Sequence, residues 1–194
     1  MLIFDEVKTG FRLSNGGARE TYEVIPDIST YAKSLGNGVP VAAFGGKSEV
    51  MNVIGGGSVA HAGTFGGNGV SMSAANAVLD ILNEAPVLKE LSIRGQKLKK
   101  GMDNILDEVG LPHQMCGHPN IQGFLITEHK VEEVRDLAYS DDAMYEKIMD
   151  HMFDRGVWVE NDPREPWFLC AAHTDEIIEE TLNVFHDSVK ASLK

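Results

Sequence analysis

The feature that most constrains this chain is a short apolar run near its start that ends abruptly in two acids. Leu2-Ile3-Phe4 leads into Asp5-Glu6, and a second extended run, Ile28–Ala32, leads into Lys33. Such runs predict strands of an α/β sheet, in which ligands bind where the strand ends emerge. We therefore expect one strand to carry the Asp5 carboxylate, and the next to deliver the Lys33 amine, to one buried site.

The charge balance excludes two classes of partner. The 194 residues include 17 Lys+Arg against 29 Asp+Glu, which gives a formal net charge of -12. Nucleic acids and anionic membranes both need a basic surface, so we expect neither as a partner. No apolar run approaches membrane-spanning length, and the first residues lack the pattern of a secretion signal. We expect a cytoplasmic protein in which Cys116 and Cys170 are reduced thiols.

Helix and strand signals divide the chain into two parts. Pro86 predicts the start of a long helix that runs to about Val109, and Gly110 stands where a left-handed cap belongs. We place a domain boundary in this helix near residue 100, so that part of an α/β sheet occupies 1–100 and a small α+β domain occupies 101–194. The other expected strands are 39–44, 113–116, 121–127, 157–159 and 167–170, and the other expected helices are 48–54, 70–82, 140–155 and one that begins after Thr174.

The three long helices of the second half have predicted core faces, read from apolar spacing. The expected core residues are Leu91, Leu98, Met102, Ile105 and Val109 in the first helix, Tyr145, Ile148, Met149 and Met152 in the next, and Ile178, Leu182, Phe185 and Val189 in the last.

The chain opens directly inside an apolar strand, without a cap or a polar lead-in. A strand buried on both faces needs neighbours, and few residues precede this one. We expect the sequence to be a piece of a larger protein.

A glycine-rich patch, Gly63–Gly69, immediately precedes the helix expected at 70–82. Such a loop, running into a helix N-terminus, presents free backbone N–H groups that bind an anion. The alternative is that the patch, with Thr64, forms only a tight turn.

Two patterns in the second half of the chain remain open. Cys116, His118, Cys170 and His173 supply four soft ligands for zinc, although their spacings are not those of a common zinc knuckle, and ordinary hydrogen bonding is the simpler interpretation. The segment Arg164–Trp167 is either a surface loop or a lid.

Four ordered motifs resemble one known family. The segments Leu2–Arg12, Pro26–Lys33, Gly38–Gly46 and Ala62–Thr64 resemble class III pyridoxal-phosphate-dependent aminotransferases, in the glutamate-1-semialdehyde 2,1-aminomutase-like branch. The C-terminal segment Ala171–Ile177 also resembles that branch. The resemblance covers essentially the whole chain, and it implies that the chain is about the second half of a family member.

The resemblance implies a role for each matching residue. Lys33 would be the Schiff-base lysine, Asp5 would pair with the protonated pyridine nitrogen of pyridoxal 5'-phosphate, and Val7 would pack on its ring. Gly63 and Thr64 would reach the cofactor phosphate of the neighbouring subunit, which implies a homodimer with shared active sites. The implied fold is α/β, of the aspartate-aminotransferase type (fold type I), with a mostly parallel sheet and a small C-terminal domain.

The implied activity is transfer of an amino group from a small-molecule donor to a carbonyl acceptor. Two alternatives accompany it. One is a true glutamate-1-semialdehyde 2,1-aminomutase that makes 5-aminolevulinate, and the other is an inactive truncated fragment of such an enzyme. Lys8 and the segments Gly36–Gly38 and Phe65–Gly69 depart from the pattern expected of a true aminomutase. The donor and the acceptor therefore stay open.

Overall fold

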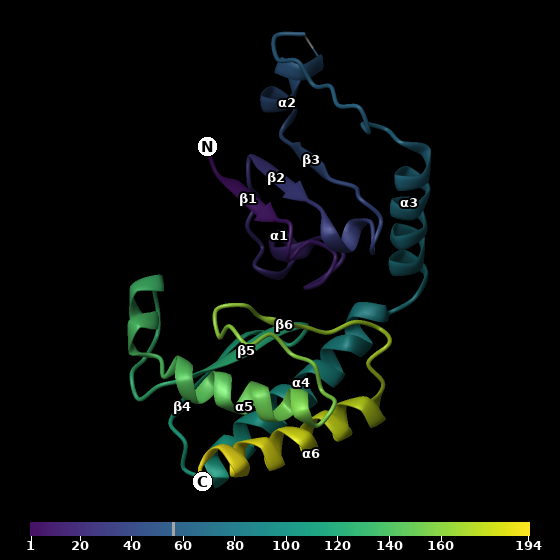
Figure 1. Ribbon diagram of the computed structural model, residues 1–194. Helices are drawn as coiled ribbons and strands as arrows, with labels where there is room; N and C mark the ends of the chain where they lie inside the picture. The colour runs from purple at the N-terminus through teal and green to yellow at the C-terminus, as the bar shows by residue number, and fades with distance from the viewer. Residues whose placement is uncertain (56) are drawn as a thin grey trace. The chain divides into compact units, whose positions relative to one another are not determined.

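The computed structural model describes residues 1–55 and 57–194, and the chain divides into two compact units, Met1–Lys89 and Glu90–Lys194 (Figure 1). The division falls near the start of helix α4 (Val87–Glu108), in the helix expected from the sequence but nearer its beginning than residue 100. Each unit has its own three-stranded sheet.

The sheet of the N-terminal unit has the order β1-β2-β3, formed by β1 (Ile3–Glu6), β2 (Ile28–Tyr31) and β3 (Ala43–Gly46). Strands β1 and β2 are parallel, and β3 runs antiparallel to β2. The part of the expected sheet that this chain supplies is thus mixed. The helical elements of this unit are α1 (Gly17–Thr21), the 3-10 turn η1 (Lys33–Leu35), α2 (Ser48–Gly55) and α3 (Gly69–Glu84).

Helix α1 was not expected, because the glycines and polar residues at 14–17 predict a loop. The helix is held by a residue distant in sequence. The carboxylate of Glu6, which is fully buried, accepts hydrogen bonds from the backbone N–H groups of Ala18 at 2.8 Å and Arg19 at 3.1 Å. An acid at a helix N-terminus satisfies donors that otherwise have no partner. This tertiary contact overrides the local signal.

The C-terminal unit packs three long helices with an antiparallel sheet in the order β4-β5-β6. The strands are β4 (His113–His118), β5 (Ile121–Ile126) and β6 (Trp167–Phe168). The helices are α4, α5 (Asp142–Asp154) and α6 (Asp175–Ser192), and η2 (Val134–Tyr139) is a 3-10 turn. In Figure 1 the three helices lie together beneath the sheet.

The predicted core faces are largely confirmed. All four α5 residues are buried, as are Leu91, Leu98, Met102, Ile178, Phe185 and Val189. Ile105, Val109 and Leu182 are only partly buried, and Leu106, which was not predicted, is fully buried. Phe124 of β5 lies at the centre, with its ring centroid 5.1 Å from that of Tyr145 and 5.4 Å from that of Phe185.

Helix boundaries in this unit follow the capping signals in the sequence. Gly110 and Gly156 have φ of 69° and 87°, and the N–H groups of the residues after them, Leu111 and Val157, donate to carbonyls five residues back. This is the Schellman arrangement. Thr174 caps α6 by accepting from the N–H of Ile177. The strand expected at 157–159 is wrong, because after the α5 cap this segment has no regular secondary structure and joins neither described sheet.

No helix in the described part of the chain combines the length and the apolar character needed to cross a membrane.

Candidate functional site

Asp5 lies near the carboxyl end of β1, directly opposite Thr30 of the parallel strand β2. Its Oδ1 accepts hydrogen bonds from the Val7 N–H at 3.0 Å and, more weakly, from the Thr30 hydroxyl at 3.4 Å. These contacts orient the carboxylate. Among the described residues, no hydrogen bond is formed to the other oxygen, Oδ2, so it is available to a ligand.

Lys33 follows β2 and begins the η1 turn. Because parallel strands point the same way, the carboxyl ends of β1 and β2 bring Asp5 and Lys33 to the same edge of the sheet, as the sequence predicted. The backbone of Lys33 has φ of 46°, in the left-handed region that L-residues rarely adopt. Non-glycine residues held in such conformations cluster at functional sites.

The prediction that this acid and this amine are buried is wrong, since both side chains are exposed. Successive side chains of a strand point to opposite faces of the sheet, so Ile3 shares the face of Asp5. Ile3 is itself 55% exposed. Within the N-terminal unit, no described residues bury that face of β1 at Ile3, whereas the opposite face is closed over Glu6 by α1. The apolar pattern of β1 predicted burial on both faces, but the face that carries Ile3 and Asp5 is exposed.

Two residues that organise this edge were not singled out from the sequence. The glutamate beside Asp5, Glu6, also accepts a hydrogen bond from the Thr9 hydroxyl at 2.7 Å, which fixes the segment that leaves β1. Thr30 meets Asp5 only because of the β1–β2 register. The sequence could have predicted the Thr30 contact if β1 and β2 had been assumed to be parallel and aligned, because Thr30 then lies opposite Asp5. Val7, the expected ring contact, is half-buried in the turn after β1.

Gly63 and Thr64 lie in the exposed segment between α2 and α3. The Gly63 carbonyl accepts the N–H of Gly66 at 3.0 Å, so the loop includes the tight turn that was one of the two sequence interpretations. The Asn68 side chain accepts from the N–H groups of Val70 at 3.1 Å and Ser71 at 3.2 Å. The prediction of free N–H groups at this helix start is wrong for these two donors, because Asn68 caps the helix.

The four candidate zinc ligands do not form a metal site. Within residues 1–55 and 57–194, no three His, Cys, Asp or Glu side chains are grouped so that they could hold a metal ion. His173 Nδ1 accepts from the Cys170 N–H at 3.0 Å, and His118 Nδ1 accepts from the Asn120 N–H at 3.2 Å. Burial raises the pKa of the Cys116 thiol and lowers the pKa of His118, so both groups favour their neutral forms.

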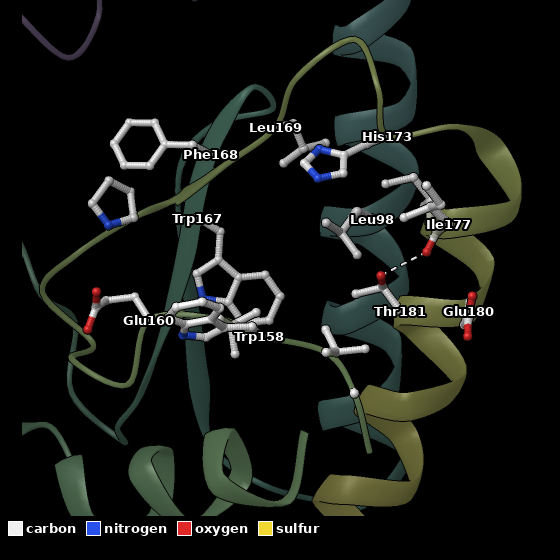
Figure 2. A pocket seen from close by; sticks show the side chains of 15 residues that line it. Leu98, Trp158, Glu160, Trp167, Phe168, Leu169, His173, Ile177, Glu180 and Thr181 are labelled. Carbon is white, nitrogen blue, oxygen red and sulfur yellow. Dashed lines mark hydrogen bonds between the residues drawn. The ribbon is translucent and has the colours of Figure 1, made fainter. Parts of the chain in front are cut away.

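A cavity of about 500 Å³ lies in the C-terminal unit, between the 157–169 segment and helices α4 and α6 (Figure 2). Its walls are mainly apolar, with the indoles of Trp158 and Trp167, and its polar side chains are Glu160, His173, Glu180 and Thr181. The described residues that line it include no lysine or arginine. Among its described lining residues the cavity therefore has no lysine amine that could bind a carbonyl ligand covalently, in contrast to the Asp5–Lys33 edge.

Arg164 belongs to the loop that the sequence left as a surface loop or a lid. Its guanidinium binds Asp162 through two hydrogen bonds, Nε to Oδ1 at 2.7 Å and Nη2 to Oδ2 at 3.0 Å. This pairing holds the pKa of Asp162 below its usual range. The arginine is exposed and engaged with its own turn.

Comparison with known proteins defines the class to which these units belong. The family model described as aminotransferase class-III matches residues 1–188, and the chain belongs to that family. Its fold is accordingly that of the fold type I enzymes. The expected family and fold class are thus confirmed.

Individual relatives of this chain include an aminomutase and two aminotransferase-family structures. The chain is 38% identical over 191 residues to a glutamate-1-semialdehyde 2,1-aminomutase of Aquifex aeolicus, across 98% of this chain and 45% of the relative. It is similar in structure to an omega-transaminase from Sphaerobacter thermophilus, with a TM-score of 0.85 and 25% identity, across 99% of this chain and 44% of that one. The PLP internal aldimine form of the FumI protein from Sphingopyxis sp. MTA144 gives a TM-score of 0.84 at 25% identity, across 98% of this chain and 43% of that one. The chain therefore spans a little under half the length of these relatives.

Proposed function

We propose that the N-terminal unit carries the lysine-bearing part of a pyridoxal 5'-phosphate site in an aminotransferase. The observation that carries this proposal is the placement of Asp5 and Lys33 at the same edge of parallel strands, both exposed, in a member of the class III family. When bound, the cofactor supplies an electron sink for a carbanion at the amino-bearing carbon of the substrate. The C-terminal unit would be the small domain.

The two principal residues have complementary roles. Asp5 would accept a hydrogen bond from the protonated ring nitrogen, and its negative charge would keep the proton there. Its Oδ1 is already held by Val7 and Thr30, so Oδ2 is the oxygen that we assign to this contact. Lys33 Nζ would hold the cofactor covalently and, when released as a free amine, would move a proton at the substrate carbon. Val7 would pack against the ring.

We further propose that Gly63 and Thr64 bind the cofactor phosphate of a partner subunit, which requires a homodimer. Their exposure in the loop between α2 and α3 supports this role, because a donor meant for another subunit must face outward. Substitution of Thr64 by Val removes the hydroxyl at nearly constant volume. We expect weaker cofactor retention in a Thr64→Val dimer, measured by dialysis and absorbance.

Mass spectrometry tests the Lys33 assignment. The 194-residue chain is mixed with pyridoxal 5'-phosphate, reduced with borohydride and digested. The phosphopyridoxyl group should be found on the Lys33 peptide in preference to Lys47, an exposed lysine of the same unit that pairs with Asp27. Equal labelling of the two lysines would contradict the proposal. An Asp5→Asn variant should be labelled at Lys33 to a smaller extent, since it lacks the charge that retains the ring proton.

For the substrate, we favour an intermolecular aminotransferase, with a true aminomutase as the alternative. The identity to the Aquifex aeolicus enzyme supports the aminomutase, and Lys8 and the altered glycine segments support a different substrate. Incubation with glutamate-1-semialdehyde, followed by product analysis, separates them. Formation of 5-aminolevulinate would identify the aminomutase, and turnover only of amine and keto-acid pairs would identify the transaminase.

A second candidate is that the chain alone is a non-catalytic fragment. The coverage of 45% of the Aquifex aeolicus relative and the open face of β1 favour it. Turnover of any amine by the isolated 194-residue chain would refute this candidate.

We also propose a cytoplasmic location, which the two free thiols support, since thiols persist in reducing compartments.

A further inference from the structure

The Ser34 hydroxyl donates a hydrogen bond of 2.7 Å to the carbonyl oxygen of Gly10, and the side chain is half-buried. These residues are 24 positions apart. The bond joins the segment that leaves β1, after Asp5, to the turn that leaves β2, after Lys33. It is thus a direct side-chain link between the two elements that carry the candidate acid and the candidate amine.

The β1 side of this link is fixed. The N–H of Gly10 donates to the backbone carbonyl of Glu6 at 2.9 Å, and the buried Glu6 carboxylate holds the intervening Thr9. Gly10 is itself buried, and a Cβ at this position would lie 2.7 Å from Tyr31 Cδ1. The Gly10 carbonyl is therefore a well-anchored acceptor beside the end of β2.

The Lys33 side needs such an anchor. Lys33 has φ of 46°, a conformation that its Cβ disfavours, and it begins a 3-10 turn of only three residues. The turn is closed by local hydrogen bonds, in which the N–H groups of Gly36 and Asn37 donate to the Lys33 carbonyl at 3.1 and 3.0 Å. Buried Leu35 holds one end of the turn by packing, and the Ser34 hydroxyl ties it to β1.

We propose that Ser34 is a positioning residue for Lys33. Its hydrogen bond to Gly10 holds the lysine backbone in the left-handed conformation and keeps the amine at a fixed place relative to Asp5. The inference rests on the proposed cofactor role of Lys33. It adds a residue that touches neither the cofactor nor the substrate and acts only through the lysine.

Three variants of the 194-residue chain test this role. Ser34→Ala removes the donor, and Ser34→Thr keeps it. Ser73→Ala is the matched control, because Ser73 is exposed on α3 of the same unit. The first readout is hydrogen exchange at the amides of Gly36 and Asn37. The second is borohydride-trapped pyridoxal phosphate on Lys33, at limiting cofactor, expressed relative to trapping on Lys47.

Loss of one neutral hydrogen bond changes a local equilibrium by roughly three- to tenfold. We expect Ser34→Ala to accelerate exchange at both amides, and to lower the Lys33-to-Lys47 labelling ratio, by factors of that size. Ser34→Thr should restore both values, and Ser73→Ala should match the unsubstituted chain. A merely structural role would loosen the whole unit and change the labelling of both lysines together.

Three results would overturn the inference. If Ser34→Ala leaves the labelling ratio unchanged in a chain whose Lys33 is labelled preferentially, the positioning role fails and the cofactor site stands. If Ser34→Ala changes exchange throughout the unit and labelling at both lysines equally, Ser34 is only structural. If the unsubstituted chain shows no preference for Lys33, the proposed cofactor site fails, and the positioning role fails with it.

Discussion

The phenol of Tyr145 offers the sharpest test of how the C-terminal unit is held together. Tyr145 is 1% exposed, accepts a hydrogen bond from the Trp167 indole N–H at 3.0 Å, and donates to the Glu160 carbonyl at 3.1 Å. Substitution by Phe removes one oxygen and keeps the ring that packs against Phe124. Glu160 is exposed, so its carbonyl gains water instead.

The expected cost comes mainly from the indole donor. Trp167 is only 7% exposed, so its N–H loses its acceptor in a place that water reaches poorly. A buried donor left without a partner costs about 1–3 kcal/mol, and we expect Tyr145→Phe to lower the free energy of unfolding by about 2 kcal/mol. The paired variant Tyr145→Phe/Trp167→Phe should show a coupling energy, because the second change removes the orphaned donor.

Urea titration followed by tryptophan fluorescence measures this cost selectively. The chain has two tryptophans, Trp158 and Trp167, and both lie in the C-terminal unit, so the signal reports that unit. Tyr139→Phe is the control, since Tyr139 is 58% exposed in the same unit. A loss for Tyr145→Phe no larger than for this control would refute the reasoning and would mean that the indole donor finds another partner.

Three further predictions follow from single contacts. Burial raises the pKa of Tyr145 to about 12, above its ordinary value near 10. The neutral phenol therefore contributes fully to the folding free energy below pH 10, and this contribution is lost as the pH rises from 10 to 12. Unfolding titrations over this range should show a loss of about 2–3 kcal/mol that Tyr145→Phe abolishes. Gly17→Ala should lower the free energy of unfolding of the N-terminal unit by more than about 2 kcal/mol in circular-dichroism melts, because φ is 68° and the new Cβ would lie 2.4 Å from Glu6 Oε2. The control is Gly67→Ala, which has φ of 69° but open space around the new Cβ, and it should cost clearly less. Equal costs for the two variants would count against the steric argument. Thr174→Ala should cost the C-terminal unit about 1 kcal/mol by fluorescence-detected unfolding, with Thr174→Ser close to the original; an unchanged Ala variant would show that the cap is dispensable.

The sequence alone determined the elements whose signals are local. The two apolar runs that end in Asp5 and Lys33, the inward face of α5, the glycine caps at 110 and 156, and the Thr174 cap all follow from periodicity and backbone preference over a few residues. The family also followed from sequence, because four ordered motifs are together specific. The assignment of individual residues to the cofactor stays a prediction.

Tertiary structure decided what depends on distant partners. Helix α1 exists because the Glu6 carboxylate reaches its N-terminus, and the glycine-rich N-terminus of α3 is closed by the Asn68 side chain. The tertiary structure also decided that Asp5 is exposed. An apolar strand pattern predicts burial, but a strand face becomes buried only when another element packs against it. The hydrogen bond from Ser34 to Gly10 joins residues 24 positions apart, and no local sequence pattern predicts it. It forms because the parallel pairing of β1 and β2 brings the segments that follow the two strands close together.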